Sequence, residues 1–468
     1  MNINNNIKPE QLLELLENDD LRRNKYLYNF IKIISYNGYN QIISLDGEWG
    51  SGKTIFVKKL ELLINYFSFY NESKKIDNKN YINKKTELNS EIVDRLSIIG
   101  RVEIYKNIKQ IVKDTNINAI YFNAWEHDDE EDPIVSIIYE IVNNFNLVDS
   151  TKKLSTGNFA ENLKSLINLL SLGNLSLGTL IDEKDLAASL RLKDDIKNSL
   201  NKVFNNIING NCDKLVIFID ELDRCKPEYA INLLERIKHY INDDRIVIVL
   251  STNIKELTHI ISTKYGNGFS SEEYLDKFID EKLYLPKVDL DDFLKTFENN
   301  IINNTKTWVS TVTKYFIEKN SLSMRQINRY MECMKHFEKY LSANYIPFER
   351  HLQIIDTLFL PYMVGLYNYS PTNYIMFISG KGENDFNNFV SGNEHVVEMC
   401  KYIFYGDASN IKKEDILNDL NKYYDLLFNE RSAQAKIEIN GIEIYKYSLQ
   451  NIYDKISLLG DIANFEKK

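Results

Sequence analysis

The chain has 468 residues, 44% hydrophobic and 26% charged, which is typical of a soluble globular protein with two to four domains. Its net charge of −10 argues against a general attraction to nucleic acid, although a local basic patch stays compatible with it. The four cysteines lack zinc-ligand or disulfide spacing, and the first residues lack a signal-peptide pattern. These features favour the cytoplasm.

The first 40 residues are predicted to form an N-terminal helical segment. Apolar residues recur at helical spacing over residues 8–36, and Asn37-Gly38 ends the pattern. Arg22 and Arg23 fit two interpretations: they reach the base or ribose of a ligand, or they are solvated on the helix surface. We favour the second, because arginines are mostly exposed in folded proteins.

Residues 47–54 match the phosphate-loop pattern G-x-x-x-x-G-K-[ST] at every position. The loop consists of Gly47, Glu48, Trp49, Gly50, Ser51, Gly52, Lys53 and Thr54. An apolar run at 42–45 precedes it and a helix-like segment at 55–66 follows, which is the strand–loop–helix context that the motif requires. We expect the loop N–H groups and the helix N-terminus to bind phosphates, Lys53 to neutralise the β- and γ-phosphates, and Thr54 to ligate Mg²⁺.

A second strand is predicted at 119–122, after a polar insertion over about 71–116. It leads into Asn-Ala-Trp at 123–125 and an acidic cluster at 128–132. Acidic residues before a helix N-terminus favour the helix dipole, and this explains the cluster without the metal site that is its alternative. A further insertion covers about 150–210, and its uncharged run at 165–181 is short for a membrane span.

The apolar run 215–219 is typical of a strand buried on both faces of a parallel sheet, and Asp220 and Glu221 follow it directly. Carboxylates at the C-terminal end of such a strand lie where ligands bind in open α/β sheets. We expect Asp220 to hold the Mg²⁺ shell, through water. Glu221 would be the general base that polarises the attacking water.

Three polar residues after the buried strands are further candidates for the site. Arg224 fits either a contact with the γ-phosphate, including that of a neighbouring subunit, or an ion pair with Asp223 or near Glu221. The next predicted strand, 246–250, ends at Ser251-Thr252-Asn253. We take Asn253 as the candidate γ-phosphate sensor and Thr252 as the second choice, with helix N-capping as the alternative.

The segment 274–286 is predicted to be a helix and a last edge strand, closed by Pro286. Residues 289–345 are predicted to form a helical lid. In it Ser323 caps a helix on which Arg325 and Arg329, four residues apart, share a face. This face either swings onto the nucleotide or is a solvated basic surface.

Residues 346–468 are predicted to form a mostly helical C-terminal domain. The alternating residues around Asn440-Gly441 predict a β-hairpin near 436–446. We interpret its exposed face and the aromatic residues between Tyr362 and Phe377 as a surface for a partner protein. No nuclease, protease or glycosidase pattern is present in the sequence.

With these motifs assembled, the chain resembles the KAP family of P-loop NTPases, a branch of the signal-transducing ATPases of the ASCE type. The resemblance is carried by LDGEWGSGKT (45–54), FNAWEHD (122–128), VIFIDELDRC (216–225), YLDKFIDEKLYLP (274–286) and MRQINRY (324–330). It implies an ATP-dependent switch with a helical lid. Some relatives carry membrane helices in their inserts, and some bacterial relatives are similar to phage-exclusion or defence proteins.

We therefore expect an α/β fold, with a P-loop NTPase domain over residues 41–288 built on a parallel sheet flanked by helices. ATP and Mg²⁺ are the expected ligands; ATP rather than GTP is implied by the resemblance alone. The leading hypothesis is a cytoplasmic ATPase switch of phage defence that forms a homo-oligomer on ATP and acts through its C-terminal region or a protein partner. The alternatives are a nucleic-acid-stimulated motor or loader and a membrane-associated scaffold.

Overall fold

In the computed structural model the chain forms two compact units, residues 2–288 and residues 289–468. The residues that the structure describes are 7–19, 22–36, 41–72, 90–130, 132–144, 162–169, 183–266, 268–291, 293–294, 306–343, 353–406, 410–428 and 436–445.

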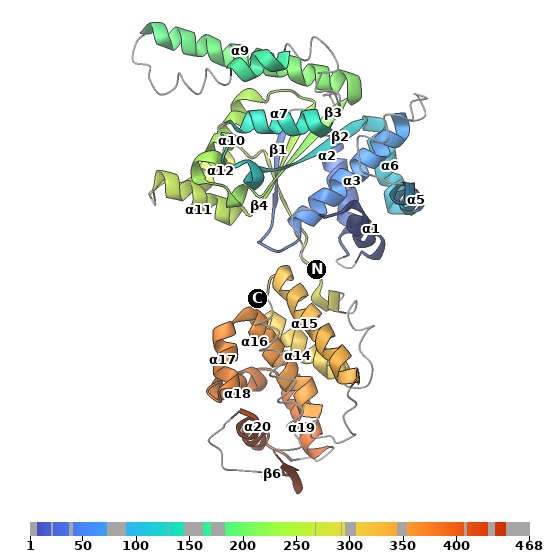
Figure 1. The fold of residues 1–468 in the computed structure, drawn as a ribbon, viewed down its shortest axis with the longest axis vertical. Helices are drawn as coiled ribbons and strands as arrows, with labels where there is room; N and C mark the ends of the chain where they lie inside the picture. The colour runs from blue at the N-terminus through green and yellow to red at the C-terminus, as the bar shows by residue number, and fades with distance from the viewer. Residues whose placement is uncertain are drawn as a thin grey trace. The chain divides into compact units, whose positions relative to one another are not determined.

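A parallel sheet of five strands forms the centre of the first unit, in the order β2-β3-β4-β1-β5 (Figure 1). Its strands are β1 (Gln41–Asp46), β2 (Ile117–Asn123), β3 (Lys214–Asp220), β4 (Ile246–Thr252) and β5 (Glu281–Tyr284). The apolar runs in the sequence predicted β1 to β4, the segment 274–286 predicted the last edge strand β5, and the expected α/β fold is confirmed. All seven residues of β4 are buried, as expected for a central strand covered on both faces.

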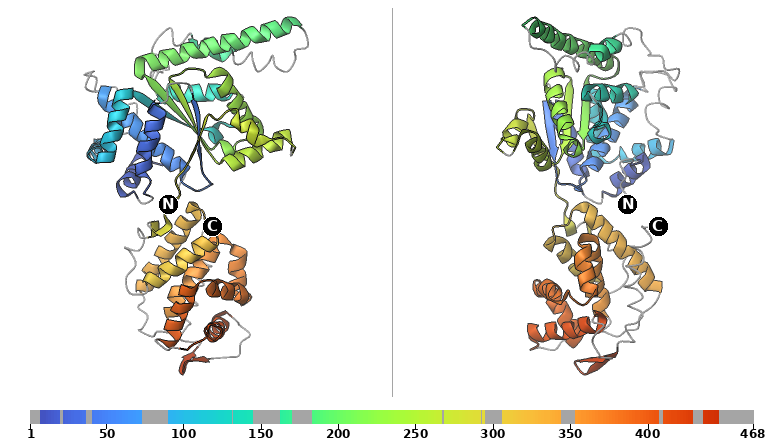
Figure 2. Two further views of the ribbon diagram at one scale, coloured as in Figure 1. Left: turned by 180° about the vertical axis from the view of Figure 1, so that it is seen from behind. Right: turned by 60° about the vertical axis from the view of Figure 1, so that its left-hand side comes forward.

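Helices cover both faces of this sheet (Figure 2). Successive side chains of a strand point to opposite faces, so each strand contributes side chains to two cores. Ile217 and Ile219 of β3 pack into a core with the helices of one face, whereas Val216 and Phe218 pack into the core of the other. The first core includes α7 (Pro133–Asn144), α9 (Glu183–Asn211), α10 (Pro227–Tyr240), α11 (Ile254–Tyr265) and α12 (Ser271–Asp276). The second includes α1 (Pro9–Asn18), α2 (Asn24–Tyr36), α3 (Lys53–Glu72), α5 (Ser90–Ile99) and α6 (Glu103–Thr115).

The N-terminal helical segment is broken into α1 and α2, so the prediction of one helical run over 8–36 is wrong at its middle. Asp19 caps α1 in the left-handed conformation, with φ 45°, which a short polar side chain tolerates. Its carboxylate accepts a hydrogen bond from the backbone N–H of Asn24 at 3.1 Å. Lys59 of α3 then donates to the Leu15 carbonyl at 2.6 Å, which fixes this corner to the helix after the phosphate loop.

Side chains of α3 cover the outer edge of β2. The Asn65 amide donates to the carbonyl of Ala119 and accepts from its N–H, both at 2.9 Å. The Glu61 carboxylate accepts from the backbone N–H of Tyr121 at 3.2 Å. The backbone groups of an edge strand that would otherwise face solvent are therefore paired here with the phosphate-loop helix.

The second unit is mostly helical over its described residues. Its elements are α14 (Lys306–Lys319), α15 (Met324–Ala343), the π-helical turn η4 (Ile355–Phe359), α16 (Leu360–Tyr369), α17 (Pro371–Ile378), α18 (Glu383–Ser391), α19 (Glu394–Tyr405), α20 (Lys413–Phe428), β6 (Lys436–Ile439) and β7 (Ile442–Tyr445). The predicted hairpin is present: β6 and β7 are antiparallel, and Asn440 and Gly441 join them with φ of 49° and 76°. Two positive φ values suit an Asn-Gly turn.

Two of the aromatic residues that we expected on a partner surface, Tyr362 and Phe377, are buried instead, whereas Tyr369 between them is 42% exposed. Tyr362 is 5% exposed and Phe377 is 1% exposed, and their ring centroids lie 5.1 Å apart. Both rings also contact the ring of Phe386, with distances between ring centroids of 4.9 Å for Tyr362 and 5.2 Å for Phe377. These side chains form the core of the second unit, because large aromatic rings on neighbouring helices gain most by packing against one another.

Within the described ranges, no helix combines the length and the apolar composition that crossing a membrane requires. The uncharged run 165–181 is described only over residues 165–169, so its interpretation lies largely outside the described part of the chain.

Candidate nucleotide-binding site

The phosphate loop joins β1 to α3, and its glycines stand where other residues would be strained. Gly50 and Gly52 have φ of 77° and 92°, in the region that favours glycine. A Cβ added at Gly47 would come within 2.9 Å of the Ser51 Oγ. The backbone N–H of Ser51 donates to the Glu48 carbonyl at 3.1 Å, which closes the loop on itself. The motif therefore forms the compact turn that phosphate binding requires.

Lys53 begins α3 and is 8% exposed. Its ammonium donates to the backbone carbonyls of Gly47 and Glu48, so it lies back over the loop. Burial lowers the pKa of Lys53, and the carboxylates of Asp223 and Asp220 oppose this effect. A buried cation whose bonds are to backbone carbonyls is well placed to exchange them for phosphate oxygens.

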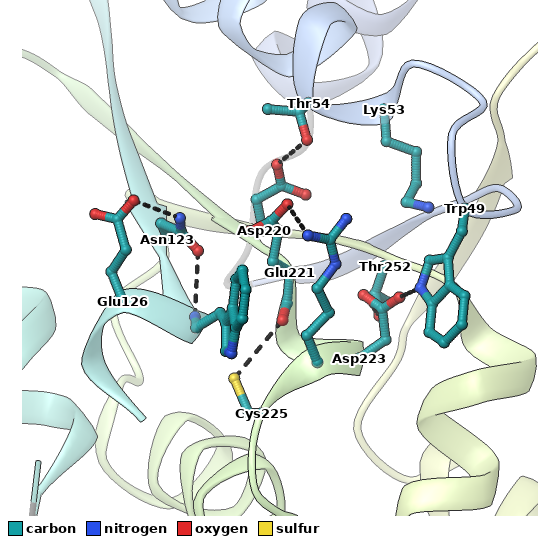
Figure 3. Close-up of polar contacts among 12 residues, drawn as sticks. Trp49, Lys53, Thr54, Asn123, Glu126, Asp220, Glu221, Asp223, Cys225 and Thr252 are labelled. Atoms are coloured by element: carbon teal, nitrogen blue, oxygen red, sulfur yellow. Dashed lines mark hydrogen bonds and ion pairs between the residues drawn. The ribbon is translucent and has the colours of Figure 1, made fainter. Parts of the chain in front are cut away.

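Thr54 and Asp220 meet at the carboxyl end of β3 (Figure 3). The Thr54 hydroxyl donates to Asp220 Oδ2 at 2.7 Å. The Tyr121 hydroxyl donates to the same oxygen at 3.1 Å. A hydroxyl and a carboxylate are ligands that Mg²⁺ accepts. The described residues contain no group of three or more His, Cys, Asp or Glu side chains that could hold a metal. Thr54 and Asp220 could hold Mg²⁺ together with the phosphate oxygens of a nucleotide and water.

Glu221 follows β3 in the left-handed conformation, with φ 61°, which is uncommon for a residue with a side chain. Its Oε1 lies 2.9 Å from Nη1 of Arg224, and its side chain is 6% exposed. The Arg224 guanidinium lies 5.5 Å from the ring centroid of Trp125. Of the two interpretations of Arg224, the structure shows the ion pair, made to Glu221 itself; the contact with a γ-phosphate stays a prediction.

Trp125 belongs to η1 (Ala124–His127), which follows β2. Asn123, the last residue of β2, accepts a hydrogen bond from the Trp125 N–H at 3.2 Å and donates to Glu126 at 2.8 Å (Figure 3). The Asn-Ala-Trp motif therefore turns the chain so that its tryptophan contacts Arg224. The role of this motif beside the acidic strand could not be derived from its residue types.

Asp223, in η2 (Leu222–Arg224), is 4% exposed and connects two other parts of the site. It accepts hydrogen bonds from the Trp49 indole N–H and from the Thr252 hydroxyl, the latter at 3.0 Å. The sequence placed Asp223 near the site but did not predict either contact. An acidic residue three positions after the acidic end of a strand was the only available signal.

Asn253 is the N-cap of α11, where its side chain accepts from the Glu256 N–H at 3.4 Å. The capping alternative is therefore the one that the structure shows, and Thr252 is the residue bound to another polar group of the site. The N–H of Ile254 bonds to Asp46 at 2.9 Å, which joins the start of this helix to the end of β1. The sensor role of Asn253 stays a prediction.

Arg23 is 6% exposed, so the favoured interpretation of a solvated arginine is wrong for this residue. Its Nη1 donates to the Ser51 carbonyl at 2.6 Å, and burial lowers the pKa of Arg23 to about 10. Its Nε has no hydrogen-bond partner among the described residues. The corner between α1 and α2 places this cation against the phosphate loop, which helical periodicity could not show.

The remaining candidates are the acidic cluster at 128–132 and the two arginines of the predicted lid. Asp132 accepts from the Ile134 N–H at 2.9 Å and lies 3.2 Å from Arg236, so this member of the acidic cluster acts at the start of α7. Arg325 and Arg329 lie on α15 in the second unit, and Ser323 forms a capping box with Gln326 at its start. Their role on a nucleotide stays a prediction.

The strand order, the phosphate loop and the acidic end of β3 define a P-loop NTPase, a nucleotide-binding protein. The model of the KAP family P-loop domain matches residues 23–341, which is more than half of the chain. The protein therefore belongs to the KAP family. No curated protein sequence matches it.

Proposed function

We propose that this protein is a Mg²⁺-dependent ATPase that works as a nucleotide-controlled switch. The observation that carries the proposal is the 2.7 Å contact between Thr54 and Asp220, since it joins the phosphate loop to the acidic end of β3. Lys53 precedes Thr54 in the sequence and Glu221 follows Asp220. The ammonium of Lys53 can bind phosphate oxygens, and the carboxylate of Glu221 can accept a proton from water. ATP rather than GTP is proposed from the family alone.

Binding of the triphosphate begins with charge. The Lys53 ammonium leaves the carbonyls of Gly47 and Glu48 for the β- and γ-phosphates, and the loop N–H groups bind the other oxygens. Thr54 and Asp220 would hold Mg²⁺, which neutralises developing negative charge when it is bound. We expect the metal to bind together with the nucleotide, whose phosphate oxygens are further ligands that Mg²⁺ accepts.

Glu221 acts as the general base on the attacking water. The water oxygen forms a bond to the γ-phosphorus while the bond to the bridging oxygen of ADP breaks, and the water proton passes to the carboxylate. Glu221 is ion-paired with Arg224, so in the proposed reaction its carboxylate accepts the water proton beside this cation.

The ATPase proposal is tested by comparing Glu221→Gln with the wild type under saturating Mg·ATP. Loss of a general base lowers turnover by about 10²–10⁴-fold, and we expect Glu221→Gln to keep its ATP affinity. The matched control is Glu103→Gln, an exposed glutamate on α6, which should turn over like the wild type. Equal rates for wild type and Glu221→Gln would remove Glu221 from the reaction.

The binding step is tested separately by calorimetry with Lys53→Ala. We expect the heat of Mg·ATP binding to disappear in this variant and to remain in Glu221→Gln. Undiminished affinity in Lys53→Ala, with a folded protein by circular dichroism, would contradict the proposed phosphate site.

The biological role is proposed from the family resemblance. The switch would act in bacterial defence against phage, through ATP-dependent self-association and a protein partner. Plating efficiency of phage on cells that express wild type or Lys53→Ala tests it, and the proposal expects protection only with the wild type. Sedimentation with and without Mg·ATP tests the self-association. Equal plating on both strains would exclude the defence role without touching the ATPase proposal.

A further inference from the structure

We propose that Asp223 is a positioning residue of the ATPase reaction. Its carboxylate binds both Trp49 of the phosphate loop and Thr252 at the end of β4, so that the loop and the end of β4 move together. The inference rests on the proposed function and adds to it a residue outside the phosphate-loop motif.

The geometry places Asp223 between two segments that are far apart in sequence (Figure 3). One carboxylate oxygen accepts from the Trp49 indole, 174 residues away, and the other accepts from the Thr252 hydroxyl at 3.0 Å. Thr252 pairs in register with Asp46, the last residue of β1 before the loop. One carboxylate therefore connects the tip of the loop, the turn after β3 and the end of β4.

Burial makes these two bonds costly to lose. Asp223 is 4% exposed and Thr252 is 0% exposed, so an unpaired oxygen or hydroxyl at either position would stay out of reach of solvent. Hydrogen bonds to an ionised carboxylate are about twice as strong as neutral ones. Trp49 is 48% exposed, so its ring is held at the surface mainly through its polar edge. A tryptophan at this place in the loop thereby acquires a fixed orientation.

Asp223 also affects the phosphate-binding lysine. Burial lowers the pKa of Lys53, and among the nearby carboxylates Asp223 opposes this lowering most strongly. Glu221 is paired with Arg224 on the other side of the same short turn. Asp223 therefore orients the loop and supports the cation, while the chemistry on water is left to Glu221.

The inference predicts that loss of the hydrogen bonds of Asp223 with Trp49 and Thr252 lowers ATP turnover. Asp223→Asn keeps the shape of the side chain but replaces one acceptor by a donor, and we expect kcat/KM for ATP to fall about 10- to 100-fold. Thr252→Val removes the hydroxyl, and Thr252→Ser, which keeps it, should retain more activity than Thr252→Val. The loss in the double variant Asp223→Asn/Thr252→Val should be smaller than the sum of the two single losses, because both changes act on the bond between these two residues. Additive losses would overturn the inference.

A second readout does not depend on catalysis. In a Trp125→Phe/Trp308→Phe background, Trp49 is the single tryptophan of the chain. Its indole N–H loses an ionised acceptor in Asp223→Asn, so we expect its emission maximum to shift before any nucleotide is added. Asp114→Asn on α6, an exposed aspartate bonded to Gln110, is the control and should leave the emission unchanged.

The two readouts separate the two proposals. If the wild type neither binds nor hydrolyses Mg·ATP, the proposed function fails, and the Trp49 emission still decides whether Asp223 holds the loop. If the wild type hydrolyses ATP and Asp223→Asn matches it in kcat/KM, the inference is overturned while the ATPase stands. Unchanged Trp49 emission in Asp223→Asn overturns it as well. Should Asp223→Asn fail to fold, Trp49→Phe and Thr252→Val carry the same test, and equal kcat/KM in both variants and the wild type overturns it.

Discussion

Replacing Glu61 by glutamine should change how the stability of the protein depends on pH. Glu61 lies on α3, and its Oε1 accepts from the Tyr121 N–H at 3.2 Å. Burial raises the pKa of its carboxyl from 4.5 to about 7, an effect that Lys58 opposes and Glu140 reinforces. The folded state therefore holds a proton on Glu61 that the unfolded state releases between these two values.

The sign follows from proton linkage. Because the native state binds more protons between about pH 4.5 and about pH 7, the free energy of unfolding falls as the pH rises through this window. The pKa differs by about 2.5 between the two states, and one pKa unit corresponds to about 1.36 kcal/mol. The free energy of unfolding therefore changes by about 3 kcal/mol across this window. The contribution is fully present below 4.5 and is lost above about 7.

Urea unfolding at pH 5 and at pH 8 measures this effect. Glu61→Gln keeps an oxygen for the Tyr121 N–H but cannot ionise. We expect the variant to be close to the wild type at pH 5 and more stable by up to about 3 kcal/mol at pH 8. Glu103→Gln, at an exposed position of α6, should show no such difference. A stability gap between Glu61→Gln and wild type that is the same at both pH values would refute the reasoning.

Three further substitutions test contacts within the units, two in the first unit and one in the second. Arg224→Ala should cost about 1–2 kcal/mol in urea unfolding, because it leaves Glu221 buried without its cation, and adding Glu221→Gln should recover part of that loss; strictly additive costs would speak against the pair. Arg23→Ala should weaken Mg·ATP binding about tenfold by calorimetry, since the loop loses its 2.6 Å bond, and an unchanged Kd would contradict this role. Gly365→Ala places a Cβ within 2.7 Å of the Phe316 ring and should lower the stability of the second unit by about 1–3 kcal/mol; an unaltered melting temperature would show that the ring can move.

The parts of the fold that the sequence predicted are those whose physics is local. Strands buried on both faces appear as apolar runs, so residues 215–219 and 246–250 indicated β3 and β4 directly. The phosphate loop is equally local, because its glycines, Lys53 and Thr54 are consecutive. The sequence assigned Thr54 and Asp220 to one Mg²⁺ site, and in the structure their side chains lie 2.7 Å apart.

The residues that the sequence missed depend on contacts between distant segments. Arg23 is buried only because α1 and α2 meet at a corner held by Asn24 and by Lys59 of α3. A helical pattern does not contain this information, although Asn18-Asp19 was a local signal for a break. Asp223 likewise acquires its role from Trp49 and Thr252, which no spacing rule connects to it.

The covered edge of β2 limits how copies of this chain can assemble. A strand from another molecule that approached this side of the sheet would find the Ala119 and Tyr121 amides already bonded to α3. Growth of the sheet by strand addition would require those bonds to break and the phosphate-loop helix to shift, which would disturb the nucleotide site. Self-association through the backbone of β2 would therefore disturb ATP binding, whereas association through side-chain surfaces would leave these bonds intact.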